Sequence, residues 1–204
     1  ASSRRAATQA LLVTTFGGLA MLVGLILFGT QTGAWKISQI AGMTDLDQIT
    51  GITAAVTLIL LGALTKSAQA PFHFWLPGAM AAPTPVSAYL HSAAMVKAGI
   101  YLMARMAPGF SDLAVWRWML VVGGGATMLL GAWRALRQTD LKLLLAHGTV
   151  SQLGFITTVI GVGSREATMA GLAITFAHSL FKAALFMIVG AIDHTLGTRD
   201  RSEE

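Results

Sequence analysis

Six long apolar segments constrain the fold of this chain more than any other feature. Each has about the 20 residues that a helix needs to cross the hydrocarbon core of a bilayer. They cover Ala7–Phe28, Gly51–Ala70, Val86–Met106, Leu113–Ala135, Asp140–Val162 and Ala167–Asp193. Only 11% of the 204 residues are charged, against about 25% in an ordinary soluble domain. The sequence therefore predicts an all-α membrane protein, a polytopic bundle of about six transmembrane helices.

Basic residues are unevenly shared between the two sides of this bundle. With six spans, one side holds both termini and carries Arg4, Arg5, Arg134, Arg137, Lys142, Arg199 and Arg201, against Lys36, Arg105, Arg117 and Arg165 on the other. The positive-inside rule then places both ends in the cytoplasm. The net charge of +5 is no sign of nucleic-acid binding, because the basic residues flank the spans or stand singly inside them.

Charge and proline occur together at the end of the second apolar segment. Lys66 comes five residues before Pro71. Proline has no N–H, so the C=O of Ser67 loses its helical partner, and the residue before a proline avoids the helical region. We therefore predict that the helix breaks at Pro71, with freed carbonyls that can hold water or the Lys66 ammonium, as in transporter ion sites. The alternative is a lysine that ends a helix and extends to the headgroups.

Three lysines lie well inside the predicted spans, whereas no Asp or Glu lies that deep; they are Lys66, Lys97 and Lys182. Lys97 is about eleven residues into its span, or ~17 Å, too deep to reach either headgroup layer easily. An isolated ammonium repels Na⁺ or Ca²⁺, which need oxygen ligands. An amine removed from water instead gives up its proton more readily. The lysines therefore favour a proton relay over a metal site.

Histidines accompany these lysines. His178 and Lys182 are four residues apart, so they share one helix face. Asp193 follows near the same face and can end this row. His91 precedes Lys97 by six residues, which points the two side chains to different sides of a helix, where they can link neighbouring cavities. The alternative for His178 and Lys182 is a structural polar contact between helices.

Two further histidines fit either a functional or a structural role. His73 follows the predicted break, and His147 is followed by Ser151 one turn later. Each can belong to the proton path or make a hydrogen bond between helices. Lys142 is only two residues into its span, so we expect it to extend to the cytoplasmic interface.

Three stretches resemble the proton-translocating, antiporter-like membrane subunits. They are TKSAQAPFHFWLPGAMAAPTPVSAYLHSAAMVKAGIYLMAR at Thr65–Arg105, DLKLLLAHGTVSQLGF at Asp140–Phe155 and FAHSLFKAALFMIVGA at Phe176–Ala191. That family includes the largest subunits of Mrp-type Na⁺/H⁺ antiporters and the antiporter-like subunits of respiratory complex I (NADH:quinone oxidoreductase), with relatives in membrane-bound hydrogenases. TTFGGLAML at Thr14–Leu22 and VKAG around Lys97 look more like the largest Mrp subunit than like the complex I forms.

The resemblance implies a fold of two inverted repeats, with residues 1–110 the end of the first and 111–204 the start of the second, in a single fragment of a longer subunit. The roles it implies fall on Lys66 in the first half-channel, His91 and Lys97 along the central polar axis, and His178 and Lys182 between the halves. It also implies a glutamate partner for Lys66, on a helix before this chain begins. His147 stands where the family usually has an aromatic residue, so its role stays open.

The sequence thus predicts proton translocation in a multisubunit Na⁺ (cation)/H⁺ antiporter of a bacterial plasma membrane, with other membrane subunits, protons, Na⁺ and lipid as partners. The first alternative is a proton-pumping membrane subunit of complex I or a hydrogenase, which would make the chain part of an enzyme. The second is a structural scaffold. We expect no catalytic residue, metal or cofactor, because there is no cysteine for Fe–S clusters and Gly123–Gly125 lacks the strand–helix context of a nucleotide site.

Overall fold

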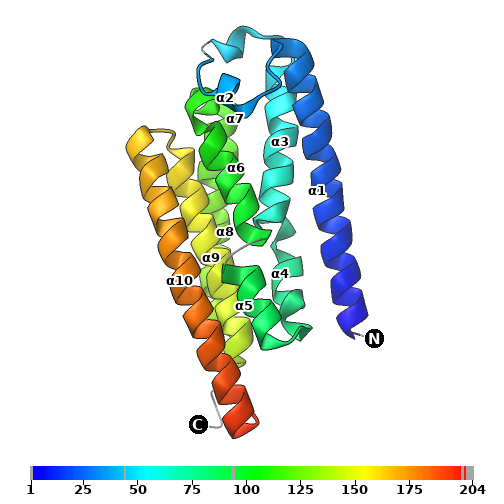
Figure 1. Cartoon of the computed structure of the whole chain (residues 1–204), viewed down its shortest axis with the longest axis vertical. Coiled ribbons are helices and arrows are strands. Elements are labelled where there is room, and N and C mark those ends of the chain that lie inside the picture. Colours follow the sequence, from blue (N-terminus) through cyan, green and yellow to red (C-terminus); the bar gives the residue numbers. More distant parts are fainter. Residues whose placement is uncertain (1, 44, 93–94, 199, 201–204) are drawn as a thin grey trace.

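The computed structural model describes residues 2–43, 45–92, 95–198 and 200. Within them, four helical runs are long and apolar enough to cross a membrane. They are α1 (Ser2–Thr32), the continuous run of α7 (Ala114–Arg117), η4 (Trp118–Val122) and α8 (Gly123–Leu136), α9 (Leu141–Gly161) and α10 (Arg165–Leu196). These helices run roughly along the long axis of the bundle (Figure 1). The chain is therefore a multi-pass helical membrane protein, as predicted.

The second predicted span holds α3 (Ile52–Lys66), which ends before Pro71. Three short elements follow beyond that span: η2 (Phe72–Phe74), α4 (Trp75–Gly78) and η3 (Ala79–Ala81). The third predicted span is described as α5 (Thr84–Ser92) and α6 (Met95–Phe110), and residues 93–94 are outside the described part of the chain. In Figure 1, α4 lies beyond the end of α3 along the long axis, and α5 lies beyond the end of α6. The predicted helix break after Lys66 is confirmed.

Local signals fix where the helices begin and end. Asp140 caps the start of α9, where its carboxylate accepts from Lys142 N at 2.8 Å and Leu143 N at 3.0 Å. Ser164 caps α10 and accepts from the backbone of Ala167 at 3.1 Å. Such caps satisfy N–H groups that have no partner inside the helix. Among its described residues, the connection between α1 and α3 holds the short α2 (Ile37–Ile40) and η1 (Leu46–Gln48).

Glycine allows the closest helix pairs, α8 with α9 and α1 with α3, to approach each other. A Cβ atom added to Gly154 would lie 2.5 Å from Met128 N and 2.7 Å from the Gly124 carbonyl oxygen. One added to Gly24 would lie 2.7 Å from Ala55 O. Lipid tails are as apolar as the side chains, so membrane helices associate through such close packing rather than through hydrophobic burial alone.

Two apolar clusters divide the interior. The larger is centred on α3, α6 and α9 and includes the edge-to-face pairs of Phe28 with Phe110 and of Phe110 with Trp116. The smaller joins α5, α9 and α10 and comprises Met80, Ala88, Leu145, Ala146, Phe186 and Val189. The buried lysines and histidines of the candidate site lie around this smaller cluster, as described next.

Candidate functional site

The helix break after Lys66 is held by side chains that bind its freed carbonyls. Ser67 O, the carbonyl predicted to lose its partner, accepts from the side-chain amide of Gln69 at 3.0 Å. Thr65 O accepts from the indole N–H of Trp75 at 3.1 Å. Carbonyls expected to hold water or the Lys66 ammonium are thus bound by neighbouring side chains, because a buried carbonyl without a partner is costly.

The same break is tied to α8 and packed closely against α6. Ala70 N donates to the hydroxyl of Thr127 at 2.9 Å, across 57 residues of sequence. Gly99 of α6 leaves room for Ser67, because a Cβ at Gly99 would overlap the Ser67 hydroxyl. Within the described residues, the Ser67 hydroxyl and the Gln69 amide oxygen are buried without a hydrogen-bond partner. The break is therefore a polar place inside an apolar bundle.

Lys66 differs from the other predicted lysines because it is only half-buried. Its ammonium makes no hydrogen bond or ion pair with any described residue. Lys66 is the last residue of α3, and α3 ends about halfway along the bundle (Figure 1). The residue thus lies far from both ends of the bundle, where lipid headgroups would be within reach.

Lys97 links three helices. Only 7% of its surface is exposed. Its ammonium donates to Ser92 O at the end of α5 and to the hydroxyl of Ser179 on α10, the latter at 2.8 Å. A cation at the C-terminal carbonyls of a helix also interacts favourably with the helix dipole. Ser179 was not among the residues predicted from the sequence. The neighbouring Thr175 hydroxyl donates within its own helix, to Gly171 O at 2.7 Å.

His178 and Lys182 share the buried face of α10, as their spacing predicts. Lys182 donates to Leu145 O on α9 at 3.1 Å. Gly148, one turn further along α9, leaves space for this ammonium, since a Cβ there would lie 3.2 Å from Lys182 Nζ. The His178 ring is fully buried, 5.1 Å from the ring of Phe181, and neither of its nitrogens has a partner among the described residues.

His91 faces α10 from α5. Its ring is fully buried and lies 4.9 Å from the ring of Phe186. Both ring nitrogens lack a partner within the described part of the chain. His178, Lys97 and Lys182 all lie within electrostatic range of His91. Four of the predicted site residues therefore come together around α10, although His91 and Lys97 belong to different helices.

The prediction for Lys142 is wrong. Instead of extending to the interface, its side chain is turned inward, is only 2% exposed and donates to Ala82 O at the end of η3. The cause is the packing of η3 against α9, where Met80 and Leu145 belong to one apolar cluster. Together with Lys97 and Lys182, Lys142 makes three buried lysines among the described residues. Because Lys142 lies only two residues into its predicted span, nothing in the sequence distinguished it from a lysine at the membrane surface.

His73 is paired with a residue that the sequence analysis counted only among the basic residues of one membrane side. Its Nε2 lies 2.9 Å from a guanidinium nitrogen of Arg134 on α8. The His73 ring is only 8% exposed, whereas Arg134 is exposed. The two residues are 61 positions apart in the sequence, so no local pattern could have predicted the contact.

His147 and Asp193 lie at the margins of this site. His147 is buried on α9, and its Nδ1 has no partner among the described residues. Ser151, one turn after it, donates to Met128 O at 2.9 Å and so joins α9 to α8. Asp193 lines a pocket between α5 and α10, together with Thr84 and His194.

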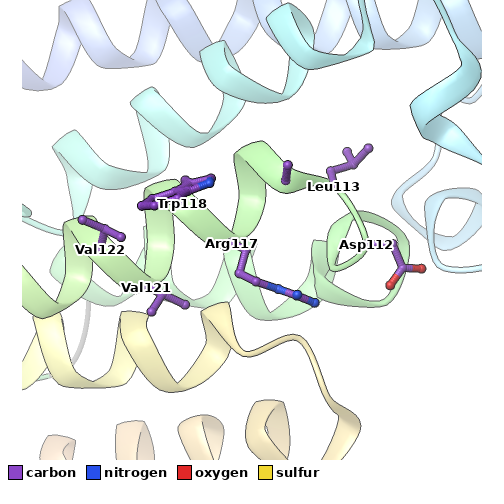
Figure 2. Close-up of a pocket in the computed structure, with 7 residues that line it drawn as sticks. Asp112, Leu113, Arg117, Trp118, Val121 and Val122 are labelled. Atoms are coloured by element: carbon purple, nitrogen blue, oxygen red, sulfur yellow. The ribbon is translucent and has the colours of Figure 1, made fainter.

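A separate surface pocket lies at the start of the α7–α8 run (Figure 2). Its lining includes Asp112, Arg117 and Trp118, beside the π-helical turn η4. Trp118 is 70% exposed, as expected for an aromatic residue at a membrane interface. The pocket contains none of the predicted path residues, so we treat it as separate from the candidate site.

Known proteins share both the sequence and the fold. The family described as NADH:quinone oxidoreductase/Mrp antiporter, transmembrane, matches residues 1–203. The chain is 50% identical over 201 residues to a probable K(+)/H(+) antiporter subunit of Rhizobium meliloti (strain 1021), covering 98% of this chain and 20% of that protein. It is 50% identical over 209 residues to a Na(+)/H(+) antiporter subunit of Alkalihalophilus pseudofirmus, covering 95% and 26%. The chain thus spans about a fifth to a quarter of the length of these curated relatives.

Solved structures agree with this relationship. The Mrp complex from Dietzia sp. DQ12-45-1b contains a chain that is 48% identical and superimposes with a TM-score of 0.90 over 95% of this chain and 22% of that one. The archaeal membrane-bound sulfane sulfur reductase contains one that is 28% identical, with a TM-score of 0.88 over 98% of this chain and 42% of that one. These matches confirm the resemblance to the Mrp form that the motifs indicated. The chain belongs to the NADH:quinone oxidoreductase/Mrp antiporter transmembrane family.

Proposed function

We propose that this chain carries protons across the membrane as part of a multisubunit cation/H⁺ antiporter, with Na⁺ or K⁺ as the counter-ion. The observation that carries the proposal is the gathering of His91, Lys97, His178 and Lys182 around the buried face of α10. Identities near 50% to antiporter subunits, against 28% to the sulfane sulfur reductase chain, favour the antiporter over a redox-driven complex.

Hydrogen-bonding capacity supports a relay between these groups. The Ser179 hydroxyl accepts from Lys97 and donates to Thr175 O at 2.9 Å, so it can both receive and pass on a proton. A neutral imidazole carries one N–H and one lone pair, so it can accept a proton at one nitrogen and release one at the other. His91 and His178, whose ring nitrogens have no described partner, are suited to bridge Lys97 and Lys182 in this way.

Electrostatic repulsion couples the protonation of the lysines in the relay. The region around α10 gathers amines in an apolar setting, where like charges repel more strongly than in water. A proton that arrives on Lys97 therefore favours release from Lys182, which lies within electrostatic range. Asp193, towards the end of the same helix, can receive the released proton. In the full-length protein, Lys66 would receive protons at the helix break in exchange with a carboxylate outside this chain.

This function also implies where the chain lies within a longer antiporter subunit. We infer that residues 1–110 end one inverted repeat and 111–204 begin the next, with both ends of the chain in the cytoplasm of a bacterial cell. The break at Lys66–Pro71 supports a transporter repeat, since discontinuous helices line the binding sites of many transporters.

Lys97→Met in the complete antiporter tests the relay. We expect at least a tenfold lower rate of proton uptake, because the thioether keeps the volume of the side chain but cannot bind a proton at neutral pH. The rate is measured with a pH-sensitive dye in reconstituted vesicles under a Na⁺ or K⁺ gradient. Lys36→Met, at an exposed lysine, is the matched control and should leave the rate unchanged. An assembled Lys97→Met complex that exchanges at the normal rate would refute the proposed relay.

Gly148→Ala tests whether the position of the Lys182 ammonium matters. The new methyl group would lie 3.2 Å from Nζ, so we expect the ammonium to shift away from Leu145 O and exchange to slow several-fold. Gly123→Ala makes the same chemical change at a site where a Cβ meets nothing within 4 Å, and it should have no effect. Equal rates in the two variants would show that exchange does not depend on the position of this ammonium.

A further inference from the structure

The contact between His73 and Arg134 determines the protonation state of the histidine. A guanidinium has five N–H donors and no acceptor. At 2.9 Å from Arg134, Nε2 of His73 can therefore only accept, with its lone pair directed at the guanidinium. A histidine that accepts at Nε2 is neutral and carries its proton on Nδ1. Arg134 thus selects one tautomer of His73 and occupies the atom at which a second proton would bind.

The contact joins a buried imidazole ring to an exposed guanidinium. His73 is buried beside the helix break, in η2, and Arg134 is exposed near the end of α8. The guanidinium therefore occupies Nε2 of the buried ring while it is itself exposed at the surface of the described chain. Among the described residues, His147 of α9 also faces the pair and lies within electrostatic range of both Arg134 and His73.

We propose that Arg134 is a positioning residue that closes the approach to His73 and the helix break. While the guanidinium is on Nε2, His73 is neutral and water cannot reach that nitrogen. When the flexible arginine side chain swings away, Nε2 is open to a proton from solvent. The purpose of this gate rests on the proposed proton function, whereas the shielding of Nε2 does not.

Chemical labelling of the assembled antiporter separates these two parts. Diethyl pyrocarbonate acylates an imidazole nitrogen whose lone pair is accessible, and mass spectrometry of the His73 peptide reports the rate. We expect His73 to react at least fivefold faster in Arg134→Leu than in the unmodified protein. Arg137→Leu is the matched control, because Arg137 lies 4.5 Å over the Trp133 ring and leaves the His73 contact intact. Equal labelling of His73 in all three proteins would overturn the shielding.

Activity then tests the gate itself. In Arg134→Leu, His73 can take a second proton, so the pH dependence of exchange should gain a step in the range where histidine titrates. Arg134→Lys keeps the charge with a single ammonium, and it should show intermediate labelling, which provides a second variant if the leucine protein does not assemble. Faster labelling with an unchanged pH profile would overturn the gating role while leaving the contact established. Loss of exchange in Lys97→Met with no effect of Arg134→Leu would separate the relay from the gate.

Discussion

Lys66→Ala is expected to reduce cation-driven proton exchange to background, while the complex still assembles. The lysine ends α3 at the break, about halfway along the bundle, and its ammonium has no hydrogen-bond or ion-pair partner among the described residues. Truncating this side chain removes no hydrogen bond or ion pair that the described part of the chain supplies, so assembly should be preserved. The loss of exchange is expected because the proposed path begins with a proton binding to this amine.

A second variant distinguishes the proton from the charge. Lys66→Arg keeps a positive charge at the break, but a guanidinium does not release its proton near neutral pH. We therefore expect Lys66→Arg to be as inactive as Lys66→Ala. Both are compared with Lys36→Ala in reconstituted vesicles, with assembly checked by size-exclusion chromatography. Full activity of Lys66→Arg would mean that the break needs a fixed cation, and a proton relay through Lys66 would be wrong.

Local chemistry in the sequence was enough to place the helix break and the buried face of α10. Pro71 has no N–H with which to continue the helix, and the spacing of His178 and Lys182 puts both on one helix face. Apolar length likewise located the long spans, although it did not reveal the short elements η2, α4 and η3 that follow α3. These features depend on residues within one or two turns, which a sequence displays directly.

Features that depend on distant partners could not be predicted. Thr127 accepts from the backbone of the break across 57 residues, and Arg134 contacts His73 across 61. Lys142 was predicted to reach the membrane surface because it lies only two residues into its span. Its ammonium instead donates to the carbonyl of Ala82, just after η3. A polar side chain near a span end has several possible partners, and only the packing of the helices selects among them.

That packing leads to the second large effect, which we expect from Gly154→Leu. A side chain at this position would meet backbone atoms of α8, with the Cβ alone 2.5 Å from Met128 N and 2.7 Å from Gly124 O. Backbone of a packed helix cannot move as a side-chain end can, and overpacking costs about 1–3 kcal/mol even where side chains can adjust. The α8–α9 pair should therefore separate, and the hydrogen bond from Ser151 to Met128 O should be lost.

Separation of α8 from α9 would also disturb the proposed proton path. The reason is that α8 carries Thr127, which binds the helix break, and Arg134, which contacts His73. We therefore expect Gly154→Leu to lose most of the assembled complex, measured as the size-exclusion peak in detergent, and to leave no exchange in the remainder. Gly123→Leu is the matched control on α8, since a Cβ there meets nothing within 4 Å, and its yield should be normal. A normal yield from Gly154→Leu would mean that these helices are held at their spacing by other contacts, and that the glycines do not set the distance at which the break is stabilised.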